Sequence, residues 1–321
     1  LKNQLLNYKY RRGRIIMGIS KYILPPPLYR LRKRNSSIRR QGRVAKAWNP
    51  IIDAYFEGKI EKYNLKPKKQ FKEGEKIIWQ YWGQGIHSSS IPELVQLCFN
   101  SVDKYKGDYK VIRLSDENLT EYIDIPNFVL WKRKNNPEFT ITFFSDLLRL
   151  ILLNVYGGVW LDATVLLTGY LPQEYTEIDY FLYQRSEEEK HKKYWSNVDP
   201  FYFNWRPNFK VKMLSSIIFA RPSSEVIRSL LDIMLCFWKN SDKLPYYFTL
   251  QVIYNEIITR KLPHLQCPTV NDCIPHIIQK KIQKGYPYLS LEDAVHFTSI
   301  HKMSYYRKEE LEDLKKLLAC L

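Results

Sequence analysis

Residues 143–162 read FFSDLLRLILLNVYGGVWLD and decide the fold. Up to Tyr156 the segment is apolar on almost every side, which predicts a helix that is buried all round. Gly157 and Gly158 then end the helix, because glycine adopts the positive φ of a helix C-terminus at little cost. The residues 159–161 that follow are typical of a short interior strand. A buried helix that turns back into a buried strand predicts an α/β domain.

Strand and helix patterns alternate on both sides of this segment. Residues 76–82, KIIWQYW, predict an opening strand that Gly83 ends, and helical spacing follows before a second strand at 109–114. Further strands are predicted at 180–183 and 213–219, and helices at 225–238 and 247–258. The chain of 321 residues is 45% hydrophobic, which is enough to bury one sizeable core. We therefore expect one main domain.

The cysteines and the apolar runs indicate a cellular setting. Five cysteines are scattered without a Cys-x-x-Cys pair, so neither a disulfide framework nor a zinc site is indicated. This usage favours a reducing, cytoplasmic compartment. Charged or polar residues interrupt every apolar run before the roughly 18 to 20 residues that a membrane-spanning helix needs, so we expect no such helix.

Positive charge is concentrated at the start of the chain. The net charge is +17, and residues 1–50 hold 14 basic residues and no acidic one. We predict that residues 1–70 form an appended basic arm, helical in part, and that residues 71–321 form the main domain. Apolar residues Leu5, Leu6, Ile15, Ile16, Ile19 and Ile23 make the arm amphipathic. Nucleic acid, anionic lipid and a pyrophosphate-bearing acceptor could each bind such an arm, and charge alone does not choose among them.

Three charged residues are candidates for chemistry. Asp146 and Arg149 stand three apart on the buried helix and share one face, where burying the pair would cost several kcal/mol. They are either an intrahelical ion pair or functional groups. Asp162 follows the strand 159–161, and ligands of open α/β sheets bind outside the carboxyl ends of strands. The alternative is an ordinary turn aspartate.

Two tryptophans close the opening strand. Trp79 and Trp82 are an odd number of residues apart, so they should face opposite sides of the strand. One is expected in the core, and the other could stack on a nucleotide base.

Together these segments resemble the capsular polysaccharide synthesis proteins related to glycosyltransferase family 32 and, more distantly, the large clostridial glucosylating toxins. The shared pattern is a Ser-Asp-x-x-Arg helix, a Gly-Gly turn and an Asp-x-Asp-like strand end. Here it reads SDLLR at 145–149 and YGGVWLDAT at 156–164. The segments 76–85, 217–222 and 301–305 also look like their family counterparts, and the likeness spans about residues 71–310.

The resemblance implies a GT-A-type, Rossmann-like nucleotide-sugar-binding domain with a mixed central sheet over residues 71–321. It implies a bacterial hexosyltransferase that uses a UDP- or GDP-sugar and retains the anomeric configuration. The implied acceptor is a growing, lipid-linked capsular or surface polysaccharide at the inner face of the cell membrane. The basic arm would then meet the membrane or the acceptor.

The resemblance also implies roles for particular residues. Trp82 would stack on the donor base, and Ser145, Asp146 and Arg149 would hold the donor sugar. Asp162 corresponds to the first aspartate of Asp-x-Asp.

The metal implied by the resemblance is Mn²⁺ or Mg²⁺. Its expected ligands are Asp162 and Thr164, completed by His301 and Ser304. Thr164 departs from the pattern, because relatives have a second carboxylate there and a neutral hydroxyl is a poorer ligand for a hard cation.

Two other interpretations were weighed. A nucleic-acid-binding protein would explain the basic arm and the 15% aromatic content. However, residues 71–321 are nearly neutral and hold no recognisable nucleic-acid-binding motif, so no specific nucleic-acid partner is expected. An inactive transferase-like scaffold is the other interpretation, and Thr164 motivates it.

Overall fold

The computed structural model describes residues 26–86, 91–283, 285–304 and 306–320, with side chains from residue 34 onward. The amphipathic stretch predicted between Leu5 and Ile23 and the position Tyr305 lie outside the described residues. The strands are β1 (Ile77–Tyr81), β2 (Lys110–Leu114), β3 (Gly158–Leu161), β4 (Val165–Leu167), β5 (Tyr180–Gln184), β6 (Met213–Ala220) and β7 (Ile300–Lys302).

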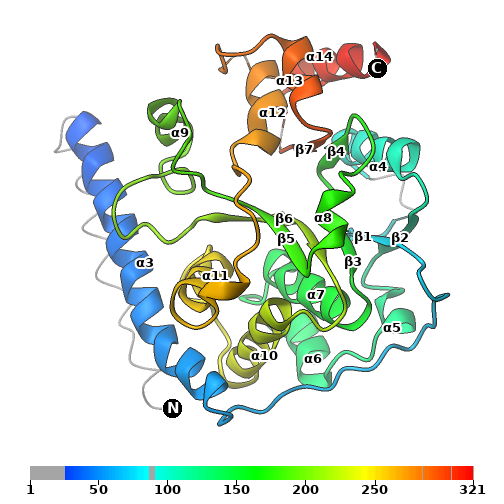
Figure 1. The fold of residues 1–321 in the computed structure, drawn as a ribbon, viewed down its shortest axis with the longest axis vertical. Helices are drawn as coiled ribbons and strands as arrows, with labels where there is room; N and C mark the ends of the chain where they lie inside the picture. Colours follow the sequence, from blue (N-terminus) through cyan, green and yellow to red (C-terminus); the bar gives the residue numbers. More distant parts are fainter. Residues whose placement is uncertain (1–25, 87–90, 284, 305, 321) are drawn as a thin grey trace.

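Helices precede, separate and follow these strands (Figure 1). In chain order they are α3 (Pro26–Phe56), α4 (Glu93–Tyr105), α5 (Leu119–Tyr122), α6 (Asn127–Asn135), α7 (Ile141–Tyr156), α8 (Glu174–Glu177), α9 (Lys192–Val198), α10 (Glu225–Asn240), α11 (Thr249–Arg260), α12 (Ile277–Ile282), α13 (Leu291–Phe297) and α14 (Lys308–Ala319). The predicted α/β class is confirmed.

The central sheet is mixed, as expected. Its strand order is β2-β1-β3-β6-β5. Strand β1 pairs in parallel with β2 and β3, whereas β6 is antiparallel to both β3 and β5. Four strands therefore run in one direction, and their carboxyl ends lie on one edge of the sheet together with the first residue of β6.

Helix layers and a small second sheet surround the central sheet. Helix α7 packs on β1, β3 and β6, and α10 packs on α7. Strands β4 and β7 form a separate antiparallel pair. Figure 1 shows β7 and the C-terminal helices α12 to α14 at one end of the molecule, close to β4 and α4.

The predicted turn between the buried helix and the strand is confirmed. Gly157 has φ 69° and Gly158 has φ 97°, which is the left-handed region that favours glycine. A Cβ on Gly158 would lie 2.5 Å from the backbone oxygen of Ile77, and one on Gly157 would lie 2.6 Å from Cδ of Pro222. The two glycines therefore allow β3 to start directly against β1, immediately after α7 ends.

The basic helix at the start is part of the domain, which corrects the expectation of an appended arm ending near residue 70. Trp48 is buried, and its ring lies 4.5 Å from that of Phe237 in α10. The hydroxyl of Tyr55 and the backbone N–H of Tyr63 both donate to Asp232, at 3.4 Å and 3.0 Å. The second half of α3 thus belongs to the same core as the sheet.

No helix within the described ranges is both long and apolar enough to span a bilayer.

The side chain of Trp79 is fully buried and donates from Nε1 to the backbone oxygen of Gly157 at 2.9 Å. It lies opposite Trp160 in the β1–β3 register. We predict that Trp79→Ala lowers the free energy of unfolding by about 3 to 5 kcal/mol, as for other large-to-small core substitutions. Trp131→Ala is the matched control, because the side chain of Trp131 is 60% exposed. This variant should change the free energy of unfolding by less than about 0.5 kcal/mol. Equal effects in urea denaturation would contradict the assignment of Trp79 to the core.

Candidate functional site

The carboxyl edge of the sheet gathers most of the polar candidates. The residues that follow β1, β2, β3 and β5 are Trp82, Ser115, Asp162 and Arg185. Because these four strands are parallel to one another, their ends share this edge, where open α/β sheets bind ligands.

Asp162 makes several polar contacts at this edge. Its backbone N–H donates to the carbonyl of Ser216 at 2.9 Å, which fixes the end of β3 against β6. Its Oδ1 accepts from Nη2 of Arg149 at 3.1 Å and from Nε1 of Trp160 at 2.8 Å. Its Oδ2 lies 3.4 Å from Nζ of Lys302. The side chain remains 25% exposed, so a ligand can reach it.

Arg149 is the buried cation at the centre of this cluster. Its side chain is 4% exposed and forms an ion pair with Asp146 as well as with Asp162. Nη2 also donates to Oγ of Ser145 at 3.3 Å, and the guanidinium carbon lies 5.2 Å from the ring centre of Trp160. Two carboxylates and an aromatic face therefore compensate for the loss of water around the guanidinium. Asp146 and Arg149 are an intrahelical ion pair, which is one of the two interpretations of the sequence, and the pair lies beside Asp162.

Burial shifts the acidity of Asp146. Loss of solvent raises the pKa of this carboxyl, Arg149 opposes the rise and the neighbouring charge of Asp162 adds to it, with the net result that the pKa is about 6. A carboxyl with a pKa near 6 changes charge within the physiological range, which is common at functional sites and less common in purely structural ion pairs.

Trp82 is half-buried and packs against Val95, Phe99 and Ala163. Ala163 directly follows Asp162, so the indole lies next to the segment that carries the polar cluster. The expectation that Trp79 and Trp82 differ in environment agrees with the structure, since Trp79 is fully buried.

Of the residues expected to share a metal, Asp162 and Thr164 both contact Lys302, whereas His301 and Ser304 have other partners. Oγ1 of Thr164 lies 2.5 Å from Nζ of Lys302. His301 is buried, with Nε2 2.9 Å from Oγ1 of Thr168, and Oγ of Ser304 accepts from Gln279. Burial lowers the pKa of His301 to about 3, so the ring is neutral.

Neighbouring strand residues point to opposite sides, so His301 points away from the side on which Lys302 reaches Asp162. Within the described ranges no three His, Cys, Asp or Glu side chains are grouped as metal ligands would be. One carboxylate, one hydroxyl and an ammonium do not fit a divalent cation.

Lys302 is the residue that sequence reasoning missed. It reaches the cluster because β7 pairs with β4, where it lies opposite Val165, and because the N–H of Met303 donates to the carbonyl of Thr164 at 2.9 Å. Two signals in the sequence pointed toward it: the missing second carboxylate at position 164 and the family-like segment 301–305 that contains it.

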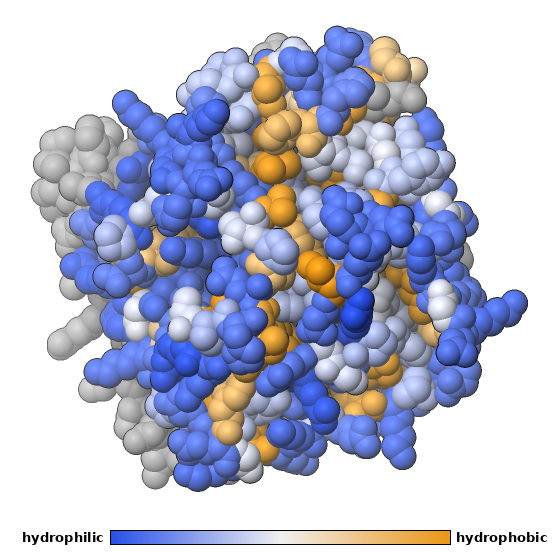
Figure 2. Space-filling model, viewed as in Figure 1, coloured by the Kyte–Doolittle hydropathy of each residue, from blue (hydrophilic) through white to orange (hydrophobic). Residues whose placement is uncertain are grey.

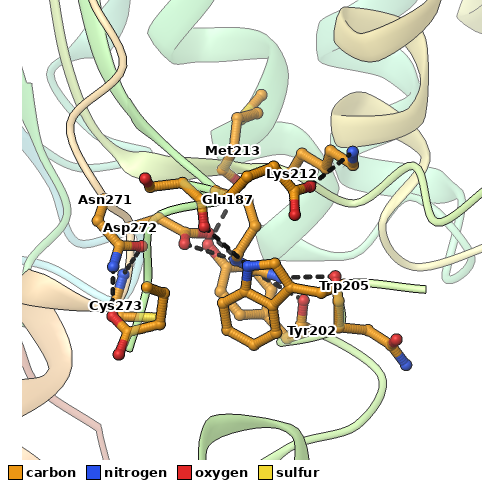
Figure 3. Close-up of polar contacts among 12 residues, drawn as sticks. Glu187, Tyr202, Trp205, Lys212, Met213, Asn271, Asp272 and Cys273 are labelled. Carbon is orange, nitrogen blue, oxygen red and sulfur yellow. Dashed lines mark hydrogen bonds and ion pairs between the residues drawn. The ribbon is translucent and has the colours of Figure 1, made fainter. Parts of the chain in front are cut away.

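A second buried ion pair lies at the same sheet edge. Nε and Nη2 of Arg185 donate to the two carboxylate oxygens of Asp272 at 2.7 Å and 2.8 Å, and both side chains are fully buried. Figure 3 shows this region, where the ring centres of Tyr202 and Trp205 lie 5.3 Å and 5.0 Å from the guanidinium carbon of Arg185. The guanidinium also donates to the carbonyls of Tyr202 and Asn204 at 2.9 Å and 3.3 Å. Because the polar atoms of Arg185 and Asp272 already have partners within the protein, we assign this ion pair a structural role.

A cavity of about 580 Å³ lies at the opposite edge of the sheet. Its lining includes Ile77 and Gly158, the first residues of β1 and β3, and Ala220, the last residue of β6. It is therefore separated by the length of the strands from Asp162, and we place the candidate site at the carboxyl edge, where the charged groups are.

Known proteins resemble parts of this chain. The O-glycosyltransferase braB of Annulohypoxylon truncatum is 26% identical over 205 residues, which cover 61% of this chain and 44% of that protein. The chain thus spans less than half the length of this curated relative. Among solved structures, the PaToxG Glycosyltransferase has a TM-score of 0.35 and 14% sequence identity, over 72% of this chain and 81% of that chain.

A sequence profile covers far more of the chain than either of these proteins. Residues 29–319 match the profile described as capsular polysaccharide synthesis protein, and the match includes most of helix α3 as well as strand β7. This chain therefore belongs to the capsular polysaccharide synthesis protein family.

Proposed function

We propose that this protein is a glycosyltransferase that moves a sugar from a nucleoside-diphosphate sugar to a growing capsular or surface polysaccharide. The observation that carries the proposal is the cluster of Asp146, Arg149 and Asp162 at the carboxyl edge of the sheet, with Trp82 beside it. Membership in the family and the activity named for the fungal relative support the same reaction class.

Each side chain has a chemical role in this proposal. The half-buried indole of Trp82 offers a face on which the donor base stacks. The carboxylates of Asp146 and Asp162 accept hydrogen bonds from sugar hydroxyls, while Arg149 and Ser145 keep them in position. A buried, prearranged set of this kind binds a sugar in one orientation, which is what transfer at a single carbon atom requires.

The reaction breaks the bond between the anomeric carbon and the diphosphate. Negative charge develops on the departing diphosphate and positive charge on the sugar, so cationic groups held near the diphosphate lower the barrier. Carboxylates near the sugar stabilise the opposite charge. We propose that the anomeric configuration is retained, as in the families that the sequence resembles, and we assign no covalent nucleophile.

We further propose that the acceptor is lipid-linked and that α3 brings the enzyme to the inner face of the cell membrane. Arg39, Arg43 and Lys46 are exposed and lie on one stripe of α3, on the other side from the buried Val44 and Trp48. In the face that Figure 2 shows, hydrophobic residues form a narrow, interrupted band and not a broad patch. Docking through the exposed basic stripe of α3 would depend mainly on charge.

Asp162→Asn removes the charge at the centre of the site and keeps the size of the side chain. We expect it to reduce transfer by about 100-fold or more, with little change in melting temperature. The assay is release of UDP or GDP from a panel of UDP- and GDP-sugars. Asp108→Asn is the control, because Asp108 is an exposed carboxylate before β2, at the opposite end of the sheet. Wild-type turnover in Asp162→Asn would refute the assignment.

The raised pKa of Asp146 predicts a pH dependence for donor binding. The carboxylate form is lost as the pH falls through about 6, so affinity for the nucleotide-sugar should fall about tenfold between pH 7 and pH 5. The rings of His276 and His301 stay neutral over this range, because burial lowers both pKa values to about 3. Calorimetric titrations at pH 5 to 8 would measure the effect. Asp146→Asn should bind weakly and without this dependence, and a flat wild-type profile would contradict the role of Asp146.

Membrane docking can be tested by neutralising the exposed stripe. The triple variant Arg39→Gln, Arg43→Gln and Lys46→Gln should co-sediment with phosphatidylserine vesicles at least about tenfold less than wild type, since each basic residue near the surface contributes about 1 kcal/mol. The control is a second triple variant with the same net charge, in which three other exposed lysines are changed to Gln: Lys104, Lys106 and Lys134. Equal loss in both variants, or binding that is indifferent to anionic lipid, would show that the stripe does not dock the enzyme.

A further inference from the structure

We propose that the ammonium group of Lys302 takes the place of a divalent metal ion in the donor site. It would bind the diphosphate of the nucleotide directly, so that donor binding needs neither Mn²⁺ nor Mg²⁺. This inference rests on the proposed function, because it assumes a nucleoside-diphosphate sugar as the donor.

The first argument is the position of the ammonium. Nζ of Lys302 lies between Oδ2 of Asp162, at 3.4 Å, and Oγ1 of Thr164, at 2.5 Å. These are the two side chains at the first and third positions of the Asp-x-Asp-like strand end. The ammonium thus occupies the space between them, where a cation shared by both would bind.

The second argument is the state of the carboxylate. Oδ1 of Asp162 already accepts two hydrogen bonds, from Arg149 and from Trp160, and Oδ2 faces Lys302. A divalent ion would have to displace a bound cation to reach either oxygen. It would also gain only a neutral hydroxyl at Thr164, which is a weak ligand for a hard cation.

The third argument is charge. Two carboxylates and a divalent cation have a formal sum of zero. Asp162, Thr164 and Lys302 have the same sum. The hydroxyl of Thr164 replaces one carboxylate, which removes one negative charge, and the ammonium of Lys302 replaces the divalent ion, which removes one positive charge. The loss of a negative charge at Thr164 is therefore balanced by the use of Lys302, with one positive charge, in place of a divalent ion.

The fourth argument is that Lys302 is held in place and still accessible. Its neighbours His301 and Met303 are fully buried, β7 is paired with β4 up to Lys302, and the N–H of Met303 donates to the carbonyl of Thr164. The lysine side chain itself is 19% exposed. An ammonium has three N–H donors, of which two point to Asp162 and Thr164, so one is left for a phosphate oxygen. Arg149 is more buried and already has three side-chain partners.

The test measures binding of UDP and GDP by calorimetry, once with EDTA and once with Mn²⁺. Wild type should bind with the same affinity in both. Lys302→Met should lose about 10- to 100-fold in both, which is the usual range for a hydrogen bond to a charged group. Lys302→Arg should keep most of the metal-independent affinity. Lys76→Met is the control, because Lys76 is exposed just before β1 at the opposite edge of the sheet.

A gain-of-function variant makes the test sharper. Thr164→Asp combined with Lys302→Met restores two carboxylates and removes the ammonium, so its nucleotide affinity should return only with Mn²⁺. Melting temperatures of all variants would show that each is folded.

The outcomes separate this inference from the proposed function. Wild-type binding that disappears in EDTA, or a Lys302→Met variant that binds as wild type does, would overturn the role of Lys302 and leave the proposed function standing. The proposed function fails if neither UDP nor GDP binds under any condition and no UDP or GDP is released from the panel of UDP- and GDP-sugars. The role of Lys302 then fails as well, because it rests on that function.

Discussion

The candidate site depends on one guanidinium, that of Arg149. A cation this deeply buried is stable only with opposite charge beside it, and Asp146 and Asp162 supply that charge from a helix and from a strand end. The interaction fixes how α7 lies relative to β3 and which way the carboxylate of Asp162 points. Because two carboxylates share this compensation, neutralising Asp162 leaves the guanidinium paired with Asp146, whereas the loss of both would leave a buried charge without a partner.

Two arginine–aspartate pairs at the same sheet edge differ in what they leave open. Arg185 and Asp272 are fully buried, and the guanidinium is surrounded by carbonyls and aromatic rings, so nothing outside the protein can contact the pair. Asp162, which pairs with Arg149, keeps a quarter of its side-chain surface accessible. The ammonium of Lys302 lies next to its other carboxylate oxygen. Arg185 and Asp272 thus form a structural ion pair, whereas Arg149 and Asp162 form part of a candidate binding surface. The difference between the two pairs is their accessibility to solvent.

Local patterns in the sequence predicted the parts of the site that are close in the chain. Asp146 and Arg149 are one helical turn apart and Asp162 follows the next strand, so spacing predicted their positions, whereas their expected roles came from the family resemblance. Lys302 could not be found in this way, because its contact depends on the pairing of β7 with β4. The packing of α3 was not predicted because positive charges dominate its composition, although Val44, Trp48, Ile52 and Tyr55 have the spacing of a helix face that packs in a core.

The pairing of β4 with β7 has a consequence for how the protein matures. Asp162 and Lys302 are 140 residues apart, so the strand that carries the aspartate emerges from the ribosome well before the lysine. At roughly 5 to 20 residues per second, this interval lasts on the order of ten to thirty seconds. During that time Arg149 can already neutralise the carboxylate, whereas the surface that would meet the diphosphate is incomplete. All strands of the central sheet have been synthesised once Ala220 is reached, so the residue that β7 adds to the candidate site is the last of its residues to be made.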